Sequence, residues 1–160
     1  MYCKTNQDPA ANKYERISAL IIERSAGVET EYKYGLMGTR GGGTGRLIFK
    51  DVKVPKENLV GPMHGGALVF HQMMIPERLT SAAACLGMAR AALDVAVRYS
   101  DRRFAFGKPI RKYQAVSFMV SDAITKLDAA RAIVYMAAKA VDNNAPNSRR
   151  LVSEAKKICN

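Results

Sequence analysis

Residues 76–114 read PERLTSAAACLGMARAALDVAVRYSDRRFAFGKPIRKYQ, and this stretch decides the fold. Leu79, Leu86 and Leu93 fall seven residues apart with alanines beside them, so one stripe of the stretch is apolar. The charged residues at spacings of four and three lie on another face: Arg90, Asp94, Arg98 and Asp101. The pattern predicts a long helix with one buried side, which ends in a basic turn.

Two motifs in this stretch carry a family resemblance. The first is E-R-L-x-x-A-A-A-x-L-G-x-A-x-A-A-L-D at residues 77–94, and the second is R-x-x-F-G-K-P-I at residues 103–110, followed by Gln114. The first resembles the opening helix of the C-terminal domain of acyl-CoA dehydrogenases, and the second resembles the turn by which that family contacts flavin. The resemblance implies an α+β chain: the end of an antiparallel β domain, followed by antiparallel helices of an acyl-CoA dehydrogenase-type C-terminal bundle.

The N-terminal third has strand and turn patterns. Residues 1–15 are polar and turn-rich, residues 17–23 form a short β-branched run, and residues 28–32 alternate as a partner strand would. Five glycines lie between residues 38 and 45, and residues 46–50 after them read as a strand. A phosphate-binding loop needs a helix after its glycines, so this loop is predicted to join two strands.

Two further runs extend the resemblance through this region. Residues 37–41 are similar to an M-G-x-R-G loop of the family, and residues 49–61 are similar to its F-x-D-V-x-V-P-x-E-N-L-[LV]-G run. In the family these runs finish the middle β domain. The resemblance therefore divides the chain into residues 1–62, the C-terminal part of the middle β domain, and residues 63–160, the N-terminal part of the helical-bundle domain. It covers less than half of a whole acyl-CoA dehydrogenase, so we expect a fragment or a split chain.

Prolines and periodicity divide the remainder into helices. Residues 66–74 are predicted to form a short helix, with Pro76 starting a separate long one, and Pro109 separates that helix from the next. Residues 148–159 begin a third helix. The second long helix has the clearest apolar seam, with steps of four and three throughout: Val116, Val120, Ala123, Leu127, Ala130, Val134, Ala137 and Val141. This seam needs a partner, so we expect self-association and a homo-oligomer.

Composition limits where the protein works. The 160 residues contain no run of about 20 apolar residues, so we expect no transmembrane helix. The N-terminus lacks the apolar core of a signal peptide. Cys3, Cys85 and Cys159 are an odd number without metal-ligand spacing, which favours a reducing compartment. We therefore expect a cytoplasmic protein, or one of the mitochondrial matrix in a eukaryote.

The net charge of +11 leaves several partners open. A basic surface attracts nucleic acids, anionic membranes, acidic proteins and phosphorylated cofactors, or it is simply a solvated surface. The basic residues are scattered, and no nucleic-acid-binding module is recognisable. The resemblance makes the pyrophosphate of FAD and the phosphates of coenzyme A the expected anions. His64 and His71 lack an acidic or cysteine partner at ligand spacing, so we expect no metal site.

Glu77 and Arg78 are the candidate catalytic residues, by resemblance. Removal of the α-proton of an acyl-CoA needs a carboxylate whose pKa is raised toward neutrality by an apolar channel. Most family members carry this base in a part that would lie beyond residue 160. A minority, including isovaleryl- and long-chain-type enzymes, carry it on this helix directly before an Arg, as in Glu77-Arg78. The alternatives are a Glu in the first turn of a helix, which complements the helix dipole, and an Arg on the surface.

Arg103, Phe106 and Gln114 are the candidate cofactor-binding residues. They match contacts that the family makes to FAD across a dimer interface, in the neighbouring subunit. A planar, permanently charged guanidinium suits a pyrophosphate. The alternative for Arg103 is a cation at a helix C-terminus. The resemblance also implies an acyl-CoA substrate and an electron-transfer flavoprotein or similar electron acceptor.

These observations support three hypotheses. The first is an FAD-dependent acyl-CoA dehydrogenase, an oxidoreductase that abstracts an α-proton and transfers a β-hydride to flavin; activity of this chain alone stays open. The second is a non-catalytic helical assembly or interaction module derived from that family. The third, supported by charge alone, is a binder of nucleic acid or membrane surfaces. Flavin absorbance separates the first two, and salt-dependent binding to DNA or anionic vesicles tests the third.

Overall fold

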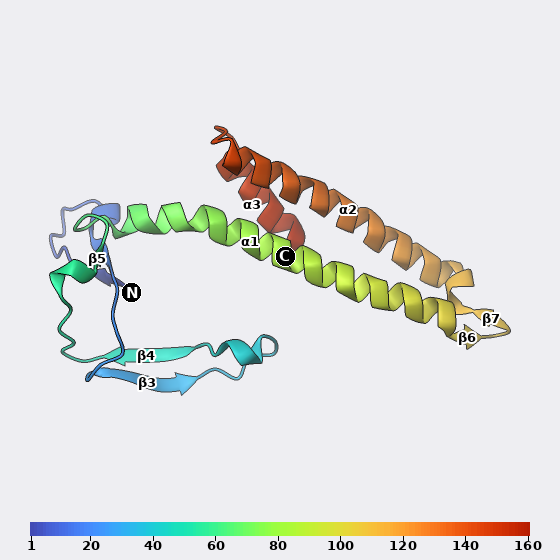
Figure 1. Cartoon of the computed structure of the whole chain (residues 1–160), viewed down its shortest axis with the longest axis horizontal. Coiled ribbons are helices and arrows are strands. Elements are labelled where there is room, and N and C mark those ends of the chain that lie inside the picture. Colours follow the sequence, from blue (N-terminus) through green and yellow to red (C-terminus); the bar gives the residue numbers. More distant parts are fainter. The chain divides into compact units, whose positions relative to one another are not determined.

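The computed structural model describes residues 1–160, which divide into two compact units, Met1–His71 and Gln72–Asn160. Strands lead and helices follow, which confirms the α+β class (Figure 1). The predicted domain boundary after residue 62 precedes the first long helix and stays a prediction. The elements in chain order are β1 Tyr2–Lys4, β2 Ile17–Leu20, β3 Val28–Lys33, β4 Gly45–Phe49, β5 Leu59–Val60, α1 Gly66–Arg102, β6 Phe104–Ala105, β7 Lys108–Pro109, α2 Gln114–Asp142 and α3 Ser148–Cys159.

The first unit contains a three-stranded antiparallel sheet in the order β1-β2-β5. Ala19 of the central strand lies opposite Tyr2 on one side and Val60 on the other. The strand predicted at residues 17–23 is thus confirmed, although it ends at Leu20. The prediction of a loop over residues 1–15 is wrong at its start, because β1 occupies three of those residues. A strand that short shows no alternation in sequence.

The strands β3 and β4 form a separate antiparallel ribbon, with Val28 opposite Phe49. The prediction that residues 28–32 pair with the strand at residues 17–23 is therefore wrong. Gly27 closes this end of the ribbon: its carbonyl accepts the Lys50 N–H at 2.9 Å, and its φ is +90°. A Cβ at Gly27 would lie 2.3 Å from the Lys50 carbonyl oxygen, so only glycine fits this close approach.

A buried cluster of polar groups joins β2 to the segment before α1. Ser18 is fully buried, and its hydroxyl lies 2.7 Å from Thr5 Oγ1 and accepts the His64 N–H at 2.9 Å. The Nδ1 atom of His64 lies 2.9 Å from the same Thr5 oxygen. Each group therefore has a partner, as buried polar groups require. The cluster stabilises His64 at a φ of +64°, a left-handed conformation that side chains rarely adopt.

The helix α1 runs without interruption through Pro76. The prediction of a short helix at residues 66–74 and a separate one starting at Pro76 is therefore wrong. A proline inside a helix removes one backbone hydrogen bond but does not oblige the chain to leave the helix. The hydroxyl of Thr80 donates to the backbone oxygens of Pro76 and Glu77, at 2.9 and 3.0 Å, and supports this turn.

The length and hydropathy of α1 can be compared with those of a membrane-spanning helix. Its most apolar 18-residue window has a mean hydropathy of 1.3, so α1 is long and apolar enough to cross a membrane by these two criteria alone. The prediction of no transmembrane helix did not anticipate this. The core helix of a soluble protein passes the same test, although only 6% of this window is buried. A single helix of this kind is weak evidence for a membrane span.

Alanine, valine and leucine residues form the core of the second unit, where α1, α2 and α3 meet. The α1 helix contributes Ala82, which is fully buried. Alanine at a helix contact allows close approach, since no long side chain separates the two backbones. The other buried members come from α2 and α3: Val134, Ala137, Ala140, Leu151, Val152 and Ala155. The α3 helix coincides with the predicted third helix, residues 148–159.

The apolar seam predicted along α2 is buried over only part of its length. Leu127, Ala130, Val134 and Ala137 are buried, whereas the earlier members Val116, Val120 and Ala123 are half-exposed. The difference follows α3, which packs against α2 at its C-terminal half. The apolar residues of the seam therefore recur at helical spacing along the whole of α2, but α3 covers only the C-terminal half of them.

Candidate functional site

A tight hairpin between α1 and α2 carries the predicted flavin-contacting residues. The two-residue strands β6 and β7 pair antiparallel, with Ala105 opposite Lys108, and Phe106-Gly107 form the turn. Both turn residues have positive φ, +50° for Phe106 and +79° for Gly107, as a two-residue hairpin turn of the I′ type requires. No strand was predicted after residue 62, so β6 and β7 are a correction to the sequence analysis.

The hairpin projects Phe106 into solvent. Its side chain is 96% exposed, although it is a large aromatic residue held in a left-handed conformation. Non-glycine residues adopt such a φ rarely, and they do so more often where a site requires it. A fully exposed phenylalanine on a rigid turn is a surface suited to contact an aromatic or apolar group.

Tyr113 clamps this turn from the chain that enters α2. Its hydroxyl donates to the backbone oxygens of Ala105 at 2.9 Å and Phe106 at 3.1 Å. The ring of Tyr113 lies edge-on to that of Phe106, with centroids 6.5 Å apart, and Lys108 Nζ lies 4.4 Å from its centroid. One side chain thus fixes the turn and holds a lysine beside it.

Positive charge gathers at this turn. Arg103 is exposed and takes part in none of the ion pairs of the chain, whereas nearby Arg111 pairs with Asp101 at 2.8 Å. The backbone of Arg103 is fixed, since its N–H donates to Tyr99 and its carbonyl accepts from Ile110, both at 2.9 Å. An unpaired guanidinium on a fixed backbone can form a forked pair with a phosphate.

Gln114 is the first residue of α2, and its side chain is exposed. The first N–H groups of a helix lack intrahelical partners, and the helix dipole favours an anion there. No side chain caps this N-terminus. The hairpin and the start of α2 thus bring together a guanidinium, an exposed aromatic ring and an amide, a set that fits an anionic cofactor with an aromatic ring.

Glu77 and Arg78 lie inside α1, and both are exposed. The interpretation of Glu77 as a first-turn residue is wrong, because α1 begins at Gly66 and its first turn holds no acidic residue. The helix dipole therefore does not account for Glu77. Arg78 donates from Nη1 to the Ser153 hydroxyl of α3 at 3.4 Å, and no ion pair joins it to Glu77.

The two groups of candidate residues lie far apart in one chain. A straight α-helix rises 1.5 Å per residue, so Glu77 and Arg102, at the end of α1, are separated by about 37 Å. The fold brings Arg103, Phe106 and Gln114 together, but it does not bring them to Glu77 and Arg78. A shared active centre would need residues from another copy or another segment.

A family model described as acyl-CoA dehydrogenase, C-terminal domain, matches residues 64–160. The chain belongs to the acyl-CoA dehydrogenase family. This confirms the resemblance found in the two motifs of α1 and the hairpin, and the matched region contains all five candidate site residues.

Individual relatives agree with this assignment. The chain is 39% identical to the caffeyl-CoA reductase-Etf complex subunit CarC of Acetobacterium woodii, over all of this chain and 42% of that protein. It is 37% identical to the mitochondrial short-chain specific acyl-CoA dehydrogenase of Rattus norvegicus, over 81% of this chain and 32% of that protein. The structure of butyryl-CoA dehydrogenase from Megasphaera elsdenii matches with a TM-score of 0.83 at 34% identity, over 96% of this chain and 41% of that one. The chain thus spans about two fifths or less of the length of these relatives.

One structural residue of the candidate site in this acyl-CoA dehydrogenase family member, Tyr113, was not predicted from sequence. Tyr113 lies one position before Gln114, outside the R-x-x-F-G-K-P-I motif. Its hydrogen bonds to Ala105 and Phe106 depend on the turn conformation, which the motif letters do not specify. The only signal available in sequence was Gly107, because glycine readily takes the positive φ that a two-residue hairpin turn requires.

Proposed function

We propose that this chain forms part of an FAD-dependent acyl-CoA dehydrogenase, which removes an α-proton from an acyl-CoA thioester and transfers the β-hydride to flavin. Residues 1–62 would be the end of its middle β domain, and residues 63–160 the start of its helical domain. The observation that carries the proposal is the fixed hairpin before α2, where Arg103 has no acidic partner and Phe106 is 96% exposed.

The hairpin residues would hold FAD. Arg103 would pair with the pyrophosphate, Gln114 would donate from its amide at the start of α2, and Phe106 would contact an aromatic part of the cofactor. Flavin, when bound, supplies the acceptor for the hydride. The separation of about 37 Å from Glu77 supports contacts made to the cofactor of a neighbouring subunit.

Glu77 would be the base that takes the α-proton. Its carboxylate is exposed in this chain, so another segment or subunit would have to cover it and exclude water. Arg78, its neighbour, would position this part of α1 through its bond to Ser153. If the base comes from elsewhere in the enzyme, as in most of the family, Glu77 would line the active centre without accepting the proton.

The partners follow from the chemistry. The substrate would be an acyl-CoA, and the reduced flavin would pass its electrons to an electron-transfer flavoprotein or a similar acceptor. The relative CarC belongs to an Etf complex by its name, which supports such a partner. A eukaryotic version would lie in the mitochondrial matrix, and a bacterial one in the cytoplasm; the rat relative is mitochondrial by its name.

One observation favours the second hypothesis, a helical assembly module without catalysis. Two large apolar side chains near the start of α2 are exposed side by side, Phe118 at 61% and Met119 at 73%. Exposed apolar residues on one helix are typical of a surface that another protein covers. The same surface would serve as an oligomer interface of the dehydrogenase, so the flavin content of the assembled protein separates the two functions.

The test is reduction of bound flavin without oxygen. The assembled enzyme that contains this chain is purified, and its visible flavin absorbance is followed while straight- and branched-chain acyl-CoA thioesters are added. We expect bleaching by at least one thioester, and none by free coenzyme A or the corresponding free acid. An assembled protein without flavin, or flavin that no acyl-CoA bleaches, would contradict the proposed function.

A further inference from the structure

Two contacts between a cation and a serine join α3 to α1. Arg78 of α1 donates to the Ser153 hydroxyl at 3.4 Å, and Lys156 Nζ of α3 donates to the Ser81 hydroxyl at 2.7 Å. The second contact lies three residues beyond the first on both helices, so α3 runs parallel to α1 and is held along it at two points.

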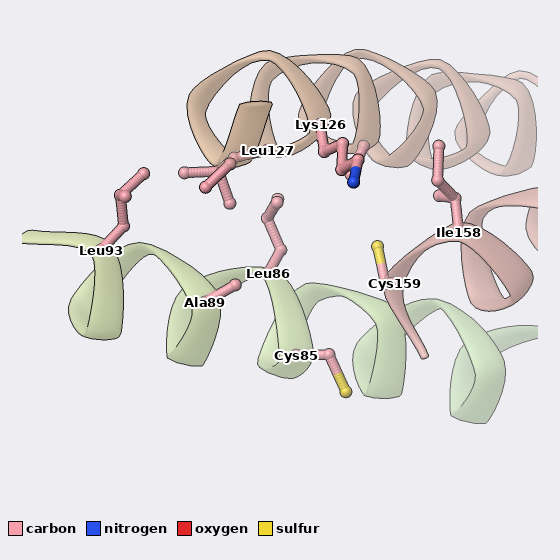
Figure 2. Close-up of a pocket in the computed structure, with 10 residues that line it drawn as sticks. Cys85, Leu86, Ala89, Leu93, Lys126, Leu127, Ile158 and Cys159 are labelled. Carbon is pink, nitrogen blue, oxygen red and sulfur yellow. The ribbon is translucent and has the colours of Figure 1, made fainter. Parts of the chain in front are cut away.

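Packing fixes the position of Lys156. Ala155 before it is fully buried. At the end of α3, Cys159 lines the same hollow as Cys85 of α1 (Figure 2). The backbone on both sides of Lys156 is therefore held against the rest of the unit, and its amino group reaches Ser81 from a fixed helix.

The Ser81 hydroxyl keeps its hydrogen available. The hydroxyls of Thr80 and Ser153 donate to backbone oxygens of their own helices, as serine and threonine often do in a helix. The Ser81 hydroxyl accepts from Lys156 and donates to no group of the chain. Together with the remaining N–H groups of the ammonium, it forms a set of donors that lacks an acceptor.

No carboxylate of the chain neutralises this lysine. Lys156 is half-buried and takes part in none of the ion pairs. Glu154, the only acidic residue of α3, pairs with Arg150 at 2.6 Å. On α1, Glu77 is the only acidic residue before Asp94. A half-buried ammonium beside a hydroxyl donor favours an acceptor that carries a negative charge.

This donor set lies beside the candidate base. Ser81 follows Glu77 by four residues in α1, and residues four apart on a helix are neighbours on its surface, with Cβ atoms about 5–6 Å apart. An acyl group whose α-carbon lies at Glu77 can therefore bring a group two or three carbons further along to Ser81 and Lys156.

We propose that Lys156 and Ser81 bind a carboxylate at the distal end of the acyl group, so that the enzyme prefers a short dicarboxylic acyl-CoA. This preference depends on the dehydrogenase function proposed above. The ammonium pairs with one carboxylate oxygen, and the Ser81 hydroxyl donates to the other. The distal carboxylate takes no part in the removal of the α-proton and the β-hydride. Lys156 and Ser81 are therefore specificity residues.

The test compares two thioesters of equal chain length in the assembled enzyme. Glutaryl-CoA ends in a carboxylate, and valeryl-CoA ends in a methyl group. The rate of flavin bleaching without oxygen is measured over a range of thioester concentrations. At low concentration we expect glutaryl-CoA to react about 10–100-fold faster. The difference should lie in the half-saturating concentration, because the carboxylate is bound equally in the ground state and in the transition state.

Lys156→Met keeps the aliphatic stem and removes the charge. We expect this variant to lose the preference for glutaryl-CoA while it reacts with valeryl-CoA at least as fast as the parent enzyme. Lys157→Met, at the exposed position that follows, is the matched control and should keep the preference. Both thioesters are compared in one preparation, so a partial loss of folded enzyme does not alter their ratio. If Lys156→Met does not fold, Ser81→Ala replaces it, with an expected loss of about tenfold in the preference.

The outcomes separate this inference from the function on which it depends. Equal rates with the two thioesters, or a preference that survives Lys156→Met, would overturn the specificity proposal and leave the dehydrogenase standing. A preference that Lys157→Met removes to the same extent would overturn it too, since general surface charge would then account for the effect. Flavin that no acyl-CoA bleaches would contradict the dehydrogenase function itself.

Discussion

The hydroxyl of Tyr113 donates a hydrogen bond of 2.9 Å to the backbone oxygen of Ala105, which ties the start of α2 to the hairpin after α1. The same hydroxyl reaches the Phe106 oxygen at 3.1 Å. Phe106 and Gln114 are thus held near each other by one side chain that lies outside the R-x-x-F-G-K-P-I motif. The geometry of the candidate flavin site therefore depends on the hydrogen bonds of Tyr113.

Replacing Tyr113 by phenylalanine should loosen the candidate flavin site. The ring remains to contact Lys108, but both hydrogen bonds to the turn are lost, at a cost of about 0.5–1.5 kcal/mol. We expect the assembled enzyme to retain less FAD after gel filtration. Tyr135→Phe is the matched control, because Tyr135 is 70% exposed and its hydroxyl makes no hydrogen bond. Equal flavin content in the two variants would show that the clamp is not needed.

Arg103→Ala should weaken FAD retention more than Lys108→Ala does. The guanidinium of Arg103 can form a forked pair with a phosphate, whereas Lys108 offers a single charged group and already lies against the Tyr113 ring at 4.4 Å. The measurement is the ratio of flavin absorbance to protein absorbance in the assembled enzyme. The same ratio in both variants would remove Arg103 from the site. This chain alone should bind FAD weakly or not at all.

Glu77→Gln distinguishes a catalytic base from a structural residue. Glutamine keeps the size of the side chain but cannot accept a proton, so turnover should fall about 10²–10⁴-fold while FAD and acyl-CoA binding persist. Glu77 is exposed and outside the first turn of α1, so the melting temperature should change little. Turnover within a few-fold of the parent enzyme would place the base elsewhere, and a lowered melting point with retained turnover would make Glu77 structural.

Ser18→Ala should destabilise the strand-containing unit. The change removes the partner of the His64 N–H and of the Thr5 hydroxyl in a fully buried site, which costs about 1–3 kcal/mol. Thermal unfolding and hydrogen exchange of residues 17–20 measure the effect. Ser25→Ala, at an exposed position of the same unit, is the control. Equal stability of the two variants would show that the cluster at Ser18 contributes little.

The helical part of the fold was largely predictable from sequence. The seam from Val116 to Val141 lies within α2, and the third helix has the predicted bounds. Long helices with repeated apolar positions carry many concordant signals, so their existence is clear without a structure. The hairpin residues Arg103 and Phe106 were found as a group because their motif is local in the chain.

Features that depend on few residues or on distant contacts were not predictable. Pro76 suggested a break in the helix, but the loss of one backbone hydrogen bond left α1 continuous. The ribbon partner of β3 was misassigned, because the alternation of residues 28–32 indicates a strand without indicating its neighbour. The strands β6 and β7 have two residues each, too few to show any period.

The distance of about 37 Å along α1 between Glu77 and the hairpin has a genetic consequence. If each active centre takes its base from one copy and its flavin contacts from the other, a chain with Glu77→Gln and a chain with Arg103→Ala are each inactive alone. In a dimer of one chain of each kind, one active centre contains both substituted residues and the other active centre contains neither. Random mixing in equal amounts would then restore about a quarter of the parental activity, so the two alleles would complement each other within one cell.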